Sequence, residues 1–156
     1  MDYQQSRAYI RDAEQYAGGA LDLTNIKEIM KRLGNPQDQL KYVHVAGTNG
    51  KGSVIAYLYT TLTNAGYHVG RYISPSVYSY REKIEVEGKP ISREQFAKHT
   101  TRVAAVIEEM TAEGLAHPTP FEIETAVAFL FFAEEKCDPV ILEVGMGGIT
   151  DATNLI

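Results

Sequence analysis

The sequence predicts an α/β fold in which a mostly parallel sheet is flanked by helices. Two observations carry this prediction. Short runs rich in β-branched residues alternate with longer segments of helical periodicity. Two of these runs, residues 41–46 and 138–145, are almost wholly apolar, as strands buried on both faces are. Ligands of such sheets bind at the carboxyl ends of the strands, so the residues that follow each strand are the first candidates for function.

The first half of the chain begins with a predicted helix in residues 21–36, which Gly34 and Pro36 terminate. Its apolar face consists of Leu23, Ile26, Met30 and Leu33. Three further elements are predicted after it: a strand over 41–46, a helix over 53–66 and a strand over 67–74.

In the second half, residues 83–91 alternate around Gly88 and predict either a small hairpin or an ordered loop. Ser92 and Gln95 form a capping-box pattern that opens a helix running to about Met110. The same device, with Thr119 as N-cap, Pro120 next and Glu122 three residues on, opens a helix over 119–136. That helix leads into the apolar strand over 138–145.

The composition is that of one soluble globular domain, with 156 residues, 44% hydrophobic and 22% charged. The longest apolar stretch, 126–133, is too short to cross a bilayer, and the N-terminus has no signal-peptide pattern. A single cysteine, Cys137, excludes an internal disulfide and suits a reducing compartment. These features predict a cytoplasmic protein without a membrane partner, and the net charge of −5 argues against a nucleic-acid partner.

The loop between the first strand and its helix has the composition of a phosphate cradle. Glycine lets the backbone approach a ligand closely, and the N-terminus of the following helix favours an anion. Lys51 adds a mobile positive charge, and the hydroxyl of Ser53 can ligate Mg²⁺. The predicted nucleotide-binding residues are Gly47, Thr48, Asn49, Gly50, Lys51, Gly52 and Ser53.

This loop departs from the strict G-x-x-x-x-G-K-[ST] pattern. Its first glycine is replaced, and Gly52 stands between Lys51 and Ser53, so a glycine-rich turn with a surface lysine is the alternative. Glu143 supports the nucleotide interpretation, because it ends an apolar strand where a P-loop protein needs an acid for Mg²⁺. The alternative for Glu143 is a strand-end glutamate that faces solvent.

Four motifs resemble folylpolyglutamate synthase and the bifunctional dihydrofolate synthase, members of the Mur ligase superfamily. In order they are "HVAGTNGKGS", "SPSVYSYREKIEVEGKPIS", "TPFEIETAVAFLFF" and "VILEVGMGGITDATN". The resemblance begins at about Leu21 and covers the rest of the chain. It implies a P-loop-containing part of a Mur ligase central domain.

The resemblance also implies an activity and its residues. Members of the family use ATP to convert a folate carboxylate to an acyl phosphate, which the amine of glutamate then attacks. Lys51 and Glu143 would be the catalytic residues, and Ser53, Ser74 and Glu143 would hold Mg²⁺. The positions that match the folate pocket are Thr119, Phe121, Asp151 and Ala152.

The chain departs from the family pattern in three places. Ser76 stands where histidine is usual, Ile149–Thr150 replaces an arginine-containing pair, and Asp22–Asn25 replaces a Gly-Leu-x-Arg segment. The last two concern the folate side of the site. Nucleotide binding is therefore implied more firmly than pterin specificity, and the choice between one and two synthase activities stays open.

The family's chains continue well past "DATN". The resemblance therefore implies that residues 1–156 are a truncated N-terminal ATPase and folate-binding domain without the C-terminal glutamate-ligase domain. We expect such a piece to be inactive alone and to self-associate through an exposed sheet edge. Two other functions stay open at this point: a different P-loop NTPase or kinase, and a non-catalytic fragment that binds nucleotide or a partner.

Overall fold

The computed structural model describes residues 1–18 and 22–156; Leu21, where the family resemblance is expected to begin, lies outside them. The helices are α1 (Tyr3–Asp12), α2 (Thr24–Arg32), α3 (Lys51–Asn64), α4 (Arg93–Ala112) and α5 (Pro120–Glu135). The strands are β1 (Tyr42–Val45), β2 (Gly70–Tyr72), β3 (Ile84–Val86), β4 (Lys89–Pro90) and β5 (Val140–Glu143). Short 3-10 helices are η1 (Ala13–Tyr16), η2 (Pro36–Gln39) and η3 (Tyr80–Lys83).

The strands form one mixed sheet in the order β1-β5-β2-β3-β4. The three strands predicted as parallel, β1, β5 and β2, are parallel. The segment predicted as a hairpin or loop is a hairpin, and its first strand, β3, pairs antiparallel with β2. Because only the short 3-10 helix η3 lies between β2 and β3, the chain lacks the longer crossover that a parallel pair requires. The predicted fold class is confirmed, with an antiparallel edge added.

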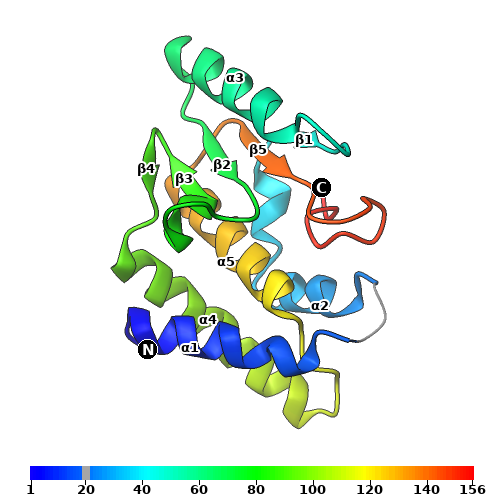
Figure 1. Cartoon of the computed structure of the whole chain (residues 1–156). Helices are drawn as coiled ribbons and strands as arrows, with labels where there is room; N and C mark the ends of the chain where they lie inside the picture. Colours follow the sequence, from blue (N-terminus) through cyan, green and yellow to red (C-terminus); the bar gives the residue numbers. More distant parts are fainter. Residues whose placement is uncertain (19–21) are drawn as a thin grey trace.

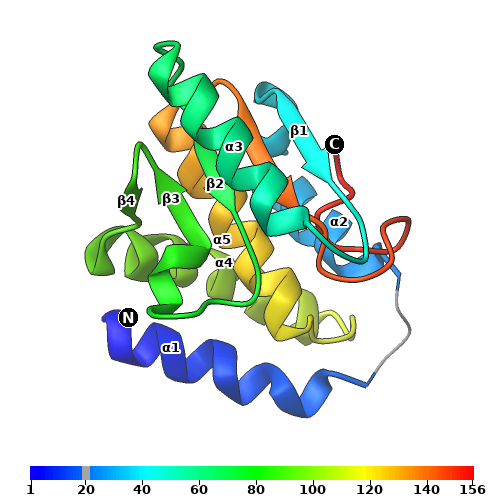
Figure 2. The same cartoon turned by 45° about the horizontal axis from the view of Figure 1, so that its top comes forward.

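Helices cover both faces of the sheet (Figures 1 and 2). On one face α3 lies over β1 and β5. On the other face lies α5, and α1, α2 and α4 pack around it. Helix α5 is apolar on all sides, and its residues from Glu122 to Phe132 are buried, so it forms the centre of the main core. Within the part of the chain that the structure describes, no helix is long and apolar enough to cross a membrane.

The capping boxes predicted at Ser92 and Thr119 are both formed. Helix α1 was not among the elements predicted from the sequence. Its signal is nevertheless present, because Asp2 and Gln5 form a third capping box, with the Gln5 N–H donating to Asp2 Oδ1 at 2.8 Å. A search for this pattern from the first residue onward would have found the helix.

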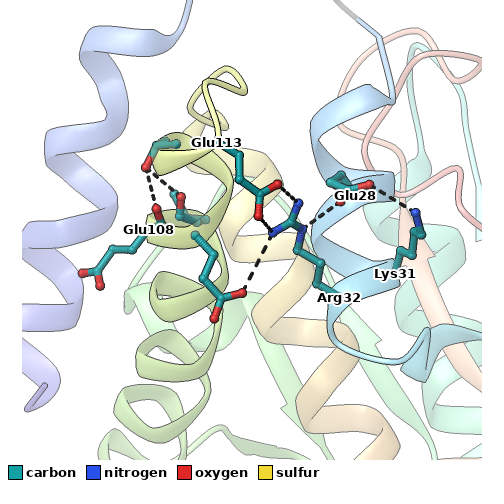
Figure 3. A network of polar contacts seen from close by, with 8 residues as sticks. Glu28, Lys31, Arg32, Glu108 and Glu113 are labelled. Carbon is teal, nitrogen blue, oxygen red and sulfur yellow. Dashed lines mark hydrogen bonds and ion pairs between the residues drawn. The ribbon is translucent and has the colours of Figure 1, made fainter.

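A network of ion pairs joins α2 to the end of α4 (Figure 3). The guanidinium of Arg32 donates two hydrogen bonds to the carboxylate of Glu113, at 2.9 and 2.6 Å, and a third to Glu28 at 2.8 Å. A planar guanidinium is suited to this two-point contact. The network fixes α2 against α4 on the side of α5 away from the sheet.

Candidate functional site

The loop after β1 has the backbone geometry of an anion site. Gly47 and Gly50 have φ values of 153° and 79°, a region that residues with a side chain rarely adopt. Gly50 is the N-cap of α3, which begins at Lys51. The N–H groups of the first turn of a helix have no partner within the helix, so they can donate to a ligand here. The strand–loop–helix order predicted from the sequence is confirmed.

Lys51, Glu143 and Ser74 come together at the carboxyl end of the sheet. The Nζ atom of Lys51 donates to the carbonyl of Gly47 at 3.1 Å and lies 3.8 Å from Oε1 of Glu143. The backbone N–H of Ser74 donates to Oε2 of Glu143 at 3.0 Å. Glu143 is buried, with 8% of the residue exposed, so it is not a solvent-facing strand end. A cation and an anion are thus held side by side next to the glycine loop.

The groups predicted for Mg²⁺ fit that ion in their chemistry. Ser53, Ser74 and Glu143 offer hydroxyl and carboxylate oxygens, the hard donors that Mg²⁺ prefers. The side chains of residues 1–18 and 22–156 contain no group of three His, Cys, Asp or Glu that could enclose a metal. Mg²⁺ commonly binds through one carboxylate, water and substrate phosphates, so this sparse set suits it.

The four residues predicted for the folate side line one cavity of about 470 Å³. Thr119 and Phe121 come from the start of α5, whereas Asp151 and Ala152 come from the segment after β5. Ser74 also lines this cavity. The ring of Phe121 stacks on that of Tyr72, with centroids 6.1 Å apart and planes at 20°. The cavity therefore has an aromatic wall, which suits a flat ring system.

Gly145, which the sequence analysis did not select, shapes this cavity. A Cβ atom on Gly145 would lie 2.7 Å from Cζ of Phe121 and 3.1 Å from Oδ2 of Asp151. A side chain at position 145 would therefore displace the ring of Phe121 and press on the carboxylate of Asp151, whereas glycine lets the strand end pass close to both residues. The signal in the sequence was the glycine directly after an apolar strand.

A second cavity, of about 390 Å³, lies beside the glycine loop. Gly47, Thr48 and Lys51 line one side of it, and residues 144–147 line the other. Gly145 and Met146 belong to the walls of both cavities. The predicted nucleotide and folate regions are therefore neighbours that share a wall.

The departures from the family pattern occupy different surroundings. Asp22 and Thr150 line the larger cavity. Ile149 is 86% exposed. Asp22 and Thr150 therefore change the composition of the wall of the folate-side cavity. At the nucleotide side, Gly47, Thr48 and Lys51 keep the residues of the family's glycine-loop motif.

Comparisons with known proteins agree with this geometry. No protein-family model matches the chain. The dihydrofolate synthase/folylpolyglutamate synthase of Bacillus subtilis is 41% identical over 155 residues, which are 99% of this chain and 36% of the relative. The folylpolyglutamate synthase of Lacticaseibacillus casei is 35% identical over 157 residues, covering 100% of this chain and 36% of the relative.

Solved structures give the same answer. The folylpolyglutamate synthase of Thermotoga maritima superimposes with a TM-score of 0.90 at 38% identity, over 99% of this chain and 35% of that chain. By sequence and by fold, the chain is a relative of folylpolyglutamate synthase. A folylpolyglutamate synthase complex with AMPPCP and folate superimposes with a TM-score of 0.92 at 35% identity, over 100% of this chain and 38% of that chain.

The chain spans about a third of the length of the curated folylpolyglutamate synthases that it matches. The fold class and the relationship predicted from the four motifs are both confirmed. A P-loop kinase or a non-catalytic binding fragment is not favoured by these relatives. The roles of individual residues stay predictions, to which the geometry above gives a structural basis.

Proposed function

We propose that residues 1–156 supply the ATP- and folate-binding part of an ATP-dependent synthase that adds glutamate to folates. The observation that carries this proposal is the meeting of Lys51, Glu143 and Ser74 between two adjoining cavities. One cavity borders the glycine loop and the other has an aromatic wall. A ligase that activates a carboxylate with ATP needs these two sites side by side.

In the proposed reaction a folate carboxylate attacks the γ-phosphorus of ATP, and the bond from that phosphorus to ADP breaks. The amine of glutamate then attacks the acyl carbon, phosphate leaves and the amine loses a proton. In both steps, negatively charged carboxylate and phosphate oxygens must lie close together. The cation of Lys51 and the N–H groups at the start of α3 would stabilise that charge on the phosphate oxygens.

Mg²⁺, when bound, supplies further positive charge to the phosphates. Glu143 is the carboxylate placed to hold it, and the hydroxyls of Ser53 and Ser74 are the additional oxygens. The hydrogen bond from the Ser74 N–H uses one lone pair of Oε2 and leaves others on both oxygens of Glu143. The carboxylate can therefore orient a metal directly or through water while it stays fixed to the sheet.

On the folate side, Phe121 and Ala152 would contact the faces of the pteridine, and Asp151 would accept a hydrogen bond from one of its N–H groups. Thr119 holds the start of α5 in place, because its N–H and hydroxyl both donate to Glu122, at 2.7 and 2.9 Å. Whether the substrate is a folate, dihydropteroate or both depends on this cavity, where Asp22 and Thr150 depart from the family pattern.

Lys51→Ala tests the nucleotide half of the proposal. In an active synthase that contains this segment, we expect the rate to fall by about 10²–10³, because one stabiliser of transition-state charge is lost. In the 156-residue chain, binding of Mg·ATP measured by calorimetry should weaken as well. Lys41→Ala is the matched control, since Lys41 pairs with Asp138 at the surface, 2.9 Å apart, at the opposite end of β1. A rate loss below about threefold at saturating ATP would remove Lys51 from this role.

A further inference from the structure

His44 makes a contact that the proposed reaction does not use. On β1, Val43 and Val45 pack into the apolar cluster beneath α3. Because side chains alternate along a strand, His44 points to the opposite face, where the segment after β5 lies. There its Nε2 atom lies 2.8 Å from the hydroxyl oxygen of Thr153.

Thr153 connects His44 to the larger cavity. Its hydroxyl donates to Oδ1 of Asp151 at 2.5 Å, and its N–H donates to the same oxygen at 3.0 Å. The N–H of Met146 donates to Oδ2 at 2.7 Å. Thr153 is fully buried and Asp151 is 5% exposed, so water does not replace these bonds. One chain of contacts therefore runs from β1 to the wall that the two cavities share.

Counting protons fixes the direction of the first bond. A hydroxyl has one proton, and an ionised carboxylate can only accept. The hydroxyl proton of Thr153 is therefore used in the hydrogen bond to Asp151. In the contact between His44 and Thr153, the Nε2 atom of His44 must then be the donor and the hydroxyl oxygen the acceptor. Burial lowers the pKa of His44 below its usual value, which favours the neutral ring. The contact with Thr153 then places the single proton of that ring on Nε2.

The same counting leaves Asp151 one acceptor direction. A carboxylate offers about four lone-pair sites, and three donors of the chain occupy three of them. Its cavity is also lined by Phe121 and Ala152. A donor group of a flat heterocycle stacked beside Phe121 would find the remaining site.

We propose that His44 is a positioning residue for the folate site, and that its Nε2–H acts through Thr153 to fix the orientation of the Asp151 carboxylate. This inference rests on the proposed function. It adds a residue from β1, remote from the motif that carries Asp151, to the group that determines affinity for the heterocycle.

The test uses the 156-residue chain and amide NMR, which detects millimolar affinities. Folate is titrated while Gly145 and Met146 are followed, and Mg·ATP is titrated separately while residues 47–52 are followed. The wild-type ring should show the Nε2–H tautomer in its ¹⁵N shifts. His44→Leu and Thr153→Val should each weaken folate binding by about tenfold or more. In both variants the Asp151 carboxylate is no longer held in the orientation that accepts a hydrogen bond from the heterocycle.

The matched variants are His44→Gln, whose amide nitrogen reaches the position of Nε2, and Thr153→Ser, which keeps the hydroxyl. Each should bind folate within about threefold of wild type, and all four variants should bind Mg·ATP within about twofold. A general loss of structure would move both affinities together, so selective loss of folate binding identifies positioning.

Three results overturn the inference. An Nδ1–H tautomer in the wild-type chain reverses the proposed hydrogen bond. Unchanged folate affinity in both His44→Leu and Thr153→Val refutes the role of His44 while leaving folate binding itself intact. Absence of any folate-dependent shift in the wild-type chain refutes the folate half of the proposed function, and the positioning role with it.

Discussion

His99 should make the stability of the fold depend on pH. It lies on α4 with no exposed surface, and its ring meets that of Phe131 edge-on. Neither ring nitrogen has a hydrogen-bond partner among residues 1–18 and 22–156. Burial lowers its pKa from 6.5 to about 4, an effect that the carboxylate of Glu134, 3.9 Å away, opposes and that Lys98 and Arg102 reinforce. The folded chain therefore contains a neutral histidine that the unfolded chain would protonate.

The sign and size follow from the two pKa values. Between pH 6.5 and 4 the unfolded state binds more protons than the folded state, so the free energy of unfolding falls as the pH falls. The stability associated with neutral His99 is complete above pH 6.5. With a folded pKa of about 4, about 2 kcal/mol is lost by pH 5 and about 3 kcal/mol by pH 4.

The assay is urea unfolding of the 156-residue chain at several pH values from 7.5 to 4.5. His99→Leu removes both the titration and the buried polar atoms, so its stability should change by about 2 kcal/mol less than that of wild type between pH 7.5 and 5. His99→Gln is the matched control, because it keeps a buried polar group that does not titrate in this range. It should show the same reduced pH dependence as the leucine variant, at a lower absolute stability. Parallel profiles for wild type and both variants would refute the reasoning.

Four further expectations follow from the site, the helix contacts and the sheet. Glu143→Gln keeps the shape and loses the charge, so in an active synthase it should shift the Mg²⁺ titration without lowering the thermal midpoint; an unchanged titration would make Glu143 a strand-end residue only. Gly145→Ala should weaken folate binding in NMR titrations by about tenfold and cost about 1–3 kcal/mol in urea unfolding, because its Cβ would lie 2.7 Å from Phe121; a folate affinity equal to that of wild type would contradict this. Arg32→Met should lower the urea midpoint, and Arg32→Lys should recover only part of the loss, because lysine cannot make the two-point contact with Glu113; full recovery by lysine would count against that contact. The chain should also self-associate as its concentration rises, because β1 is an edge strand of the sheet in the part of the chain that the structure describes; a monomer throughout sedimentation at high concentration would oppose this.

The parts of the site that the sequence predicted are those encoded locally. The glycines, Lys51 and Ser53 follow one another in a single loop, and Glu143 ends a run whose apolar character marks a central strand. Capping boxes are likewise local, which is why the starts of α4 and α5 were predicted correctly.

The parts that the sequence did not predict depend on distant contacts. His44 and Thr153 are separated by 109 positions, and no periodicity relates a residue on one strand to a turn after another. The need for glycine at position 145 arises from the ring of Phe121, which α5 brings there. Only the packing of β5 between its neighbours and against α5 makes these relations visible.

The order of the strands also has a kinetic consequence. Strand β5, the middle one of the three parallel strands, comes last in the sequence, while its neighbours β1 and β2 come earlier and do not pair with each other. Tyr42 pairs with Val140 and Gly70 with the same residue, so both parallel ladders must wait for the final strand. Contacts between such distant residues form slowly, since a long loop must close first. Strand β5 also carries Glu143 to Lys51, so the parallel part of the sheet and the site should form together during folding. Hydrogen-exchange protection of β1 and β5 should therefore rise together with the first appearance of nucleotide binding.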